Sequence, residues 1–155
     1  RGLINFKGVQ RRFNKIFSYN KIDFYDDYAH HPTEIRSVLE GVKNVYGKHE
    51  KVCIFQPHRI SRLKDLRKEF SESFKDADIV ILCPIYTAGE KMKLGFSYNN
   101  FAKEIIKNSK VKLFLVNNNI QLAKFLKKNM YGDKIVIGMG AGSISNWIKK
   151  LPELM

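Results

Sequence analysis

The strongest constraint on the fold is a repeated alternation between two hydrophobic periodicities. Short runs of β-branched and aromatic residues give way to segments with apolar residues three and four positions apart, which is typical of strands connected by helices. Most of the short runs are continuously apolar, as expected of parallel strands covered on both faces. We therefore expect a three-layer α/β sandwich with a mostly parallel sheet. The predicted strands are residues 22–26, 52–56, 79–83, 111–116 and 135–138.

The segments between these runs predict helices, and residues 32–46 are the clearest case. Their apolar side chains fall on one helical face, Pro32 suits the first turn and Gly47 suits the end. Residues 60–74 repeat the pattern. Ser97 is suited to cap a third helix, whose expected buried residues are Phe101, Ile105 and Ile106. Two shorter helices are expected at residues 120–128 and 143–151.

The opening of the chain follows a different pattern. The segment RRFNKIFSYNKIDFYDDY consists of two extended stretches around a polar tetrad, residues 18–21, which predicts a β-hairpin. We expect residues 1–21 to form this lead-in. All 155 residues should belong to one domain, because a single hydrophobic core typically organises about 100–200 residues.

The net charge of +13 raises the alternative of a nucleic-acid-binding module. The lysines are scattered at the polar positions of the predicted helices, which favours a solvated surface instead. No apolar stretch approaches the roughly 20 residues that cross a bilayer, so we expect a cytoplasmic protein without a membrane segment. Cys53 and Cys83 lie in apolar runs and are expected to be buried thiols.

Ionisable side chains crowd the junction after the first predicted strand, in the run DDYAHH at residues 26–31. Ligands of parallel sheets bind beyond the carboxyl ends of the strands, so this run is a candidate site. One alternative is that Asp27 and His31 satisfy backbone donors at the helix start. Another is a divalent-metal site, which we disfavour because His58 would have to join it beside two arginines. No protein-ligated metal is therefore predicted.

The segment FQPHRISR, residues 55–62, follows the second predicted strand. Arg59 and Arg62 are three positions apart, which places both guanidiniums on one side of a helix. Together with the helix N-terminal amides they predict a receptor for a carboxylate or phosphate. The alternative is that each arginine pairs on the surface with Asp65 or Glu69.

Two loops rich in small residues follow later strands, YTAGE at residues 86–90 and GMGAGS at residues 138–143. The second superficially matches a dinucleotide fingerprint, but it follows the last strand instead of the first. The chain also lacks a Walker phosphate loop and a nucleophile elbow.

Five segments, GVQRRF, DDYAHHPTEI, FQPHRISR, YTAGEK and GMGAGSI, occur in an order and spacing that resemble the C-terminal domain of the Mur ligases. The resemblance spans nearly the whole chain, and it is most specific in DDYAHHPTEI and FQPHRISR. It points to members of the family that use L-alanine. Members that attach a whole tripeptide share the DD-x-A-HHP run, but FQPHR resembles the alanine-using members more.

The resemblance implies a Rossmann-like domain whose partner domains, an N-terminal UDP-sugar domain and a central ATPase, are not in this chain. The family uses ATP and Mg²⁺ to activate a carboxylate as an acyl phosphate, which the amine of the amino acid then attacks. The implied substrates are L-alanine, ATP and UDP-N-acetylmuramate, for peptidoglycan synthesis, and this chain alone should be inactive.

The resemblance also implies roles for individual residues. Ser143 stands where the family has aspartate and Thr87 where alanine is frequent, so the roles of their loops stay open. His30 or His58 could assist proton removal from the amine, although positioning is the more conservative role. Arg12 and Asp27 match positions that reach ATP. The positions matching residues around the incoming alanine, with the arginines facing its carboxylate, are Tyr28, His30, His58, Arg59 and Arg62.

Overall fold

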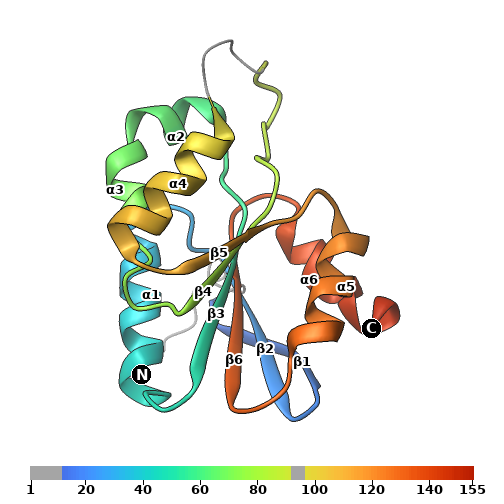
Figure 1. The fold of residues 1–155 in the computed structure, drawn as a ribbon. Helices are drawn as coiled ribbons and strands as arrows, with labels where there is room; N and C mark the ends of the chain where they lie inside the picture. The colour runs from blue at the N-terminus through green and yellow to red at the C-terminus, as the bar shows by residue number, and fades with distance from the viewer. Residues whose placement is uncertain (1–11, 92–96) are drawn as a thin grey trace.

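The computed structural model describes residues 12–91 and 97–155, and these form one six-stranded sheet covered by helices on both faces (Figure 1). The strand order is β1-β2-β6-β3-β4-β5. The strands are β1 (Asn14–Tyr19), β2 (Ile22–Asp27), β3 (Glu50–Phe55), β4 (Ile79–Leu82), β5 (Lys112–Leu115) and β6 (Lys134–Met139). The helices are α1 (Pro32–Val45), α2 (Ile60–Asp65), α3 (Arg67–Ser71), α4 (Tyr98–Ser109), α5 (Asn119–Asn129) and α6 (Ile144–Leu154).

The predicted β-hairpin is confirmed for the described residues. Strands β1 and β2 pair antiparallel, and Asn20 and Lys21 form the turn with φ of 52° and 65°. Positive φ at both central residues matches the twist of a two-residue hairpin. The second strand is also the first parallel strand of the sheet, since β2 pairs with β6. The hairpin is therefore part of the sheet, while residues 1–11 of the expected lead-in lie outside the described residues.

Two apolar clusters, one on each face of the sheet, confirm the three-layer prediction. Helices α1 to α4 cover one face, and α5 and α6 cover the other (Figure 1). Successive side chains of β3 point to opposite faces of the sheet, so Phe55 belongs to the first cluster and Ile54 to the second. Both cysteines are buried and reduced, as expected. No helix among the described residues is long and apolar enough to cross a membrane.

The predicted helix over residues 60–74 is wrong in one respect, because the chain breaks at Leu66 into α2 and α3. Leu66 has φ −114° and ψ 25° and closes α2 by donating its N–H to the Arg62 carbonyl at 3.0 Å. The break changes the direction of the chain, and both Leu63 and Phe70 still enter the same cluster. Periodicity alone does not reveal such a break, because the apolar spacing continues across it.

Two predictions of burial are also corrected. Ile106 is 44% exposed, because the buried face of α4 is filled by Phe101, Ala102 and Ile105. Strand β5 lies at the sheet edge, and its Phe114 and Leu115 are exposed, so the expectation that strands are covered on both faces fails there. The cap at Ser97 is confirmed, since its hydroxyl accepts the N–H of Asn100 at 3.1 Å.

Four strands end together at one edge of the sheet. The parallel register aligns Asp27 of β2 with Met139 of β6, Met139 with Phe55 of β3, and Phe55 with Leu82 of β4. The segments that follow these strands therefore meet at the same edge, as expected for the ligand-binding side of a parallel sheet.

Candidate functional site

Asp27 occupies the end of β2 and is almost fully buried. Its two carboxylate oxygens accept the backbone N–H groups of Phe13 and Ala29, each at 2.8 Å. Burial raises the pKa of Asp27, and the two hydrogen bonds and the nearby Arg12 charge oppose that rise. Asp27 does satisfy backbone donors, but these donors lie outside α1 and not at its start as the alternative supposed, and they hold the carboxylate beside Arg12.

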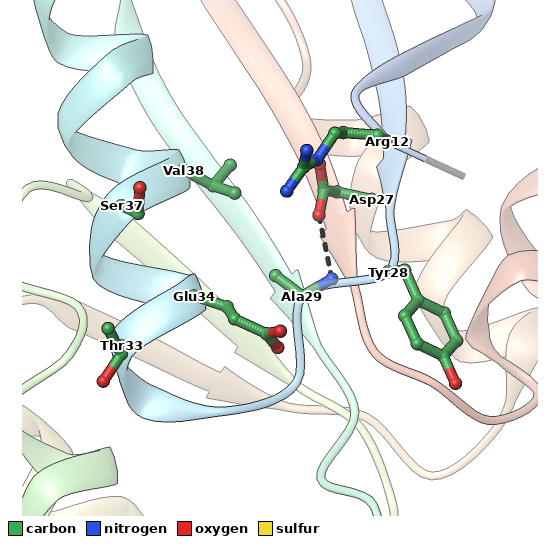
Figure 2. A pocket seen from close by; sticks show the side chains of 8 residues that line it. All are labelled: Arg12, Asp27, Tyr28, Ala29, Thr33, Glu34, Ser37 and Val38. Atoms are coloured by element: carbon green, nitrogen blue, oxygen red, sulfur yellow. Dashed lines mark hydrogen bonds between the residues drawn. The ribbon is translucent and has the colours of Figure 1, made fainter. Parts of the chain in front are cut away.

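Arg12 and Asp27 lie side by side at the mouth of a groove against α1. Figure 2 shows the Arg12 side chain over the Asp27 carboxylate, facing Ser37 and Val38 of α1. One cavity of about 340 Å³ includes these residues together with Thr33 and Glu34. A second cavity of about 390 Å³ shares Arg12 and Asp27 and continues along the apolar side of α1, where it is lined by Phe13, Val38, Val42, Val45 and Tyr46.

The start of α1 fixes the histidine pair that follows Asp27. His31 is the N-cap, and its Nδ1 accepts the N–H of Thr33 at 3.2 Å. The Glu34 carboxylate accepts the N–H groups of His30 and His31, each at 3.1 Å, which completes a capping box. The interpretation of His31 as a helix cap is therefore confirmed.

The remaining side chains of the DDYAHH run point elsewhere. Asp26 accepts the hydroxyl of Ser145 at 2.8 Å on the α6 side. In Figure 2 the Tyr28 ring points away from α1. Within the described residues no group of three or more His, Cys, Asp or Glu side chains is arranged to hold a metal ion.

Aromatic rings form a continuous row at the carboxyl edge. Tyr28 contacts His30 edge-on at a centroid distance of 5.0 Å, and His30 contacts His58 at 6.0 Å. His58 in turn stacks on Tyr86 at 5.5 Å. The structure thus brings together three predicted site residues from two strand ends, and it adds Tyr86, which the sequence reasoning missed.

The two histidines of this row have different surroundings. His30 Nδ1 lies 2.9 Å from the Tyr28 carbonyl, which can only accept, so Nδ1 is the donor and a neutral ring keeps its lone pair on Nε2. His58 Nδ1 is buried without a hydrogen-bond partner among the described residues. Burial lowers the pKa of His58, and the charges of His30, Arg62 and Arg59 lower it further. These surroundings therefore favour the neutral form of the His58 imidazole.

Arg59 and Arg62 line one cavity of about 370 Å³, together with Ser61, Asp65 and Leu66. The expected helical spacing is wrong, because Arg59 lies outside α2 with φ 70° and ψ 131°. The chain still presents both guanidiniums to the same space. Within residues 12–91 and 97–155 no ion pair joins either arginine to Asp65 or Glu69, so the surface-pairing alternative finds no support.

The first-turn amide of α2 already has an acceptor. Glu90 of the YTAGE loop accepts the Ser61 N–H at 3.1 Å and the Ser61 hydroxyl at 2.6 Å. The Ser61 amide is therefore not available to join the arginines in binding an external anion. The arginines alone supply the positive charge that this cavity offers.

The glycine-rich loop after β6 is shaped by packing. Gly140 has φ 152°, and a Cβ there would lie 2.9 Å from the Gln56 carbonyl oxygen. The Gln56 side chain accepts the N–H of Ile144 and donates to the Ser143 hydroxyl, both at 3.0 Å. The sequence predicts no role for Gln56, because its one signal is a polar residue at the end of a buried strand.

The carboxyl edge of this α/β sheet thus carries a pair of arginines, a row of rings and a separate groove against α1. The family model "Mur ligase, glutamate ligase domain" matches residues 11–142. The chain belongs to the Mur ligase family, and the resemblance inferred from its segments is confirmed.

Two curated relatives show which members of the family this chain is similar to. The UDP-N-acetylmuramate–L-alanine ligase of Pelagibacter ubique (strain HTCC1062) is 70% identical over 155 residues, which is 100% of this chain and 33% of that protein. The ligase of the same name from Rickettsia bellii (strain OSU 85-389) is 42% identical over 98% of this chain and 32% of its own length. This chain thus spans about a third of the length of the curated relatives it matches.

Solved structures agree with the fold. The UDP-N-acetylmuramate-alanine ligase of Thermotoga maritima superposes with a TM-score of 0.71 and 27% identity, over 92% of this chain and 29% of that one. A murein peptide ligase from Psychrobacter arcticus gives a TM-score of 0.74 at 19% identity, over 96% and 30%. The second likeness shows the fold alone.

Proposed function

We propose that this chain is the amino-acid-accepting domain of a ligase that joins L-alanine to the carboxylate of UDP-N-acetylmuramate with consumption of ATP. The observation that carries the proposal is the 70% identity to a UDP-N-acetylmuramate–L-alanine ligase over the full length of the chain. Residues 1–155 would then be the C-terminal domain, and the UDP-sugar and ATPase domains would belong to the rest of the protein. A cytoplasmic location follows from the use of ATP and a nucleotide sugar in peptidoglycan precursor synthesis.

In this proposal the carboxylate of L-alanine binds Arg59 and Arg62. A planar guanidinium matches a carboxylate with two parallel hydrogen bonds. Both arginines line one cavity, and neither forms an ion pair with a carboxylate of the described residues. The amine of alanine would lie toward the row formed by Tyr28, His30 and His58. Fixing an amine and an acyl group in attacking geometry supplies a large part of the rate of such reactions.

Burial and the adjacent positive charges lower the pKa of His58 and so favour its neutral form, which is the form that can accept a proton from the incoming ammonium group. His30 keeps Nε2 as its acceptor nitrogen and is the second candidate for this step. Positioning by either ring would serve the reaction without proton transfer, so both are assigned to the amino-acid site first.

Arg12 and Asp27 are proposed to contact ATP. The fit rests on the groove, because a cation and a carboxylate stand at its mouth and apolar side chains of α1 continue it, as a phosphate, a ribose and a base would require. Mg²⁺ would neutralise charge on the phosphates during acyl phosphate formation, and the chain's own contribution is the Arg12 guanidinium.

The test is an amide-formation assay on the full-length protein. ATP and UDP-N-acetylmuramate are supplied with L-alanine, glycine, L-serine or the tripeptide, and the product is identified by mass spectrometry. ATP-dependent formation of the L-alanine amide, in preference to the other three, is expected. Preference for the tripeptide would replace this proposal with the alternative, a ligase that attaches a whole tripeptide to the same sugar nucleotide in a recycling reaction.

The 155-residue chain by itself serves as the matched control for the domain assignment. It should neither hydrolyse ATP nor form an amide, because the phosphate loop is absent from its sequence. Turnover by the purified chain would contradict the proposed division into domains.

A further inference from the structure

Tyr86, in the loop after β4, contacts the amino-acid site through its ring. The ring lies nearly parallel to the His58 imidazole, with 14° between the planes and 5.5 Å between the centroids. The same ring packs against Gly142, where an added Cβ would lie 2.4 Å from Tyr86 Cγ. The glycine-rich loop therefore limits the positions that the ring can take.

Tyr86 also contacts the site through its backbone. Its N–H donates to the Pro57 carbonyl and its carbonyl accepts the N–H of Arg59, each at 2.8 Å. These bonds form an isolated parallel bridge between His58 and Tyr86, beyond the last paired residues of β3 and β4. The β-type pairing thus extends into the site.

Arg59 needs such support because its backbone is strained. Its φ of 70° with ψ 131° falls in a region that residues with a Cβ rarely adopt. Such a conformation persists only where the surroundings enforce it. The hydrogen bond to the Tyr86 carbonyl on one side, and that from the Leu63 N–H to the Arg59 carbonyl at 3.2 Å on the other, enforce it here.

The far end of the same loop is fastened as well. Glu90 binds the N–H and hydroxyl of Ser61, so residues 86–90 are joined to residues 57–61 at both ends. Between these points Ala88 and Gly89 have φ of 52° and 89°, which closes the loop tightly. The loop is therefore a fixed support beneath His58 and Arg59.

We propose that Tyr86 is a positioning residue of the amino-acid site, whose ring sets the plane of the His58 imidazole and whose carbonyl holds the Arg59 backbone. This inference rests on the proposed function for the roles of His58 and Arg59. Few other contacts restrain the imidazole, since Nδ1 has no hydrogen-bond partner among the described residues and His30 touches it only edge-on.

Several elements surround His58 and determine its response to pH. His30 faces it from the β2–α1 connection, Arg59 and Arg62 from the start of α2, and Glu90 from the loop, where its negative charge opposes the others. The Tyr86 ring covers the imidazole from its flat side. Loss of that ring would admit water, so the lowered pKa of His58 should move back toward its ordinary value.

Kinetics of the full-length ligase test the positioning role. Tyr86→Phe keeps the ring and should leave kcat and KM for L-alanine within about twofold. Tyr86→Leu should lower kcat/KM for L-alanine about tenfold to a hundredfold, the scale of a small misplacement of reacting groups, with KM for ATP unchanged. Tyr131→Leu, at a 68% exposed tyrosine beside the opposite end of β6, is the matched control and should change neither. Unchanged alanine kinetics in Tyr86→Leu, or equal losses for alanine and ATP, would overturn the proposal.

NMR titration of the His58 ring in the 155-residue chain tests the contact between Tyr86 and His58 without an activity assay. The pKa of His58 should be lowered in the parent chain and in Tyr86→Phe, and should rise in Tyr86→Leu together with a change in its ring-current shift. An unchanged His58 in Tyr86→Leu would refute the positioning role. If His58 responds as expected but the parent full-length protein does not use L-alanine, the proposed function fails and the positioning role stands.

A second variant guards against a failure of Tyr86→Leu to fold. Gly142→Ala leaves Tyr86 in place but adds a methyl group where its ring now lies. The variant should shift the His58 resonances and lower kcat/KM for L-alanine in the same direction. Gly47→Ala, just beyond α1 and outside the lining of the cavities described above, adds the same methyl group 3.2 Å from the Lys43 carbonyl oxygen; it is the control and should leave both readouts unchanged.

Discussion

Ser61 donates both its backbone N–H and its hydroxyl to the Glu90 carboxylate, at 3.1 Å and 2.6 Å. An internal anion thus occupies the first-turn amide of α2, which the sequence pattern had assigned to a substrate. A bound amino acid would then depend on the two guanidiniums of Arg59 and Arg62 for its carboxylate.

The same contact predicts a pH dependence of stability. Hydrogen bonds from Ser61 hold the pKa of Glu90 below its usual value of 4.5. A carboxyl whose folded pKa is lowered stabilises the fold above the unfolded pKa and loses this contribution as the pH falls through the folded pKa. Glu90→Gln should therefore be less stable than the parent chain at pH 7, with the difference closing in acid. Urea unfolding from pH 7 to pH 2 measures it, and Ser61→Ala should add little in the double variant. A difference that stayed constant down to pH 2 would contradict this reasoning.

Gln56 is expected to be a stability residue. Replacing it with alanine leaves the buried N–H of Ile144 without its acceptor, which should cost about 1–3 kcal/mol of unfolding free energy. Gln121→Ala is the matched control, because Gln121 also accepts a backbone N–H, from Asn117 at 2.8 Å, but does so at an exposed position. Its cost should be about 0.5 kcal/mol or less. Equal costs in denaturant titrations would mean that burial of the Gln56 bonds has no special effect.

Asp27→Ala in the full-length ligase should raise KM for ATP by about tenfold or more, since a hydrogen bond to a charged group is worth about 1.5–3 kcal/mol. KM for L-alanine should change little. Asp23→Ala, on the same strand with an exposed carboxylate bound to Ser18, controls for general damage to β2. A selective loss of alanine affinity in Asp27→Ala would contradict the proposed contact of Asp27 with ATP and place this residue in the proposed amino-acid site.

The variant Arg62→Lys distinguishes two roles for Arg62, binding the carboxylate of L-alanine or forming an ion pair on the surface. Lysine keeps the charge but loses the planar fork, so KM for L-alanine should rise about tenfold to a hundredfold, equivalent to about 1.5–3 kcal/mol. KM for ATP should hardly move. Arg36→Lys, at an exposed arginine on α1, should change neither. A change only in stability, of under about 1 kcal/mol, is what a surface ion pair would give instead.

Local sequence was sufficient for the elements whose signals lie within a few residues of one another. The apolar face of α1, its Pro32 and its His31 cap stand within one short segment, and the helix forms as expected. The strand runs were recognisable because a β-strand buried on both faces needs uninterrupted apolar residues. The same logic placed the candidate site residues Tyr28, His30 and His58 after strand ends, where ligands of parallel sheets bind.

Only the tertiary structure decided which segments share that edge. Strand β6, last in the sequence, pairs between β2 and β3, and this places Gln56 against Ile144, 88 positions away. Contacts between distant segments also decide the break at Leu66, the exposure of Ile106 and the contact of Tyr86 with His58. The sequence by itself determined the strands, the helix starts and the chemistry of the side chains, because these depend on neighbours along the chain. Strand order and the partners of Tyr86 and Glu90 depend on contacts between distant segments, which no local periodicity encodes.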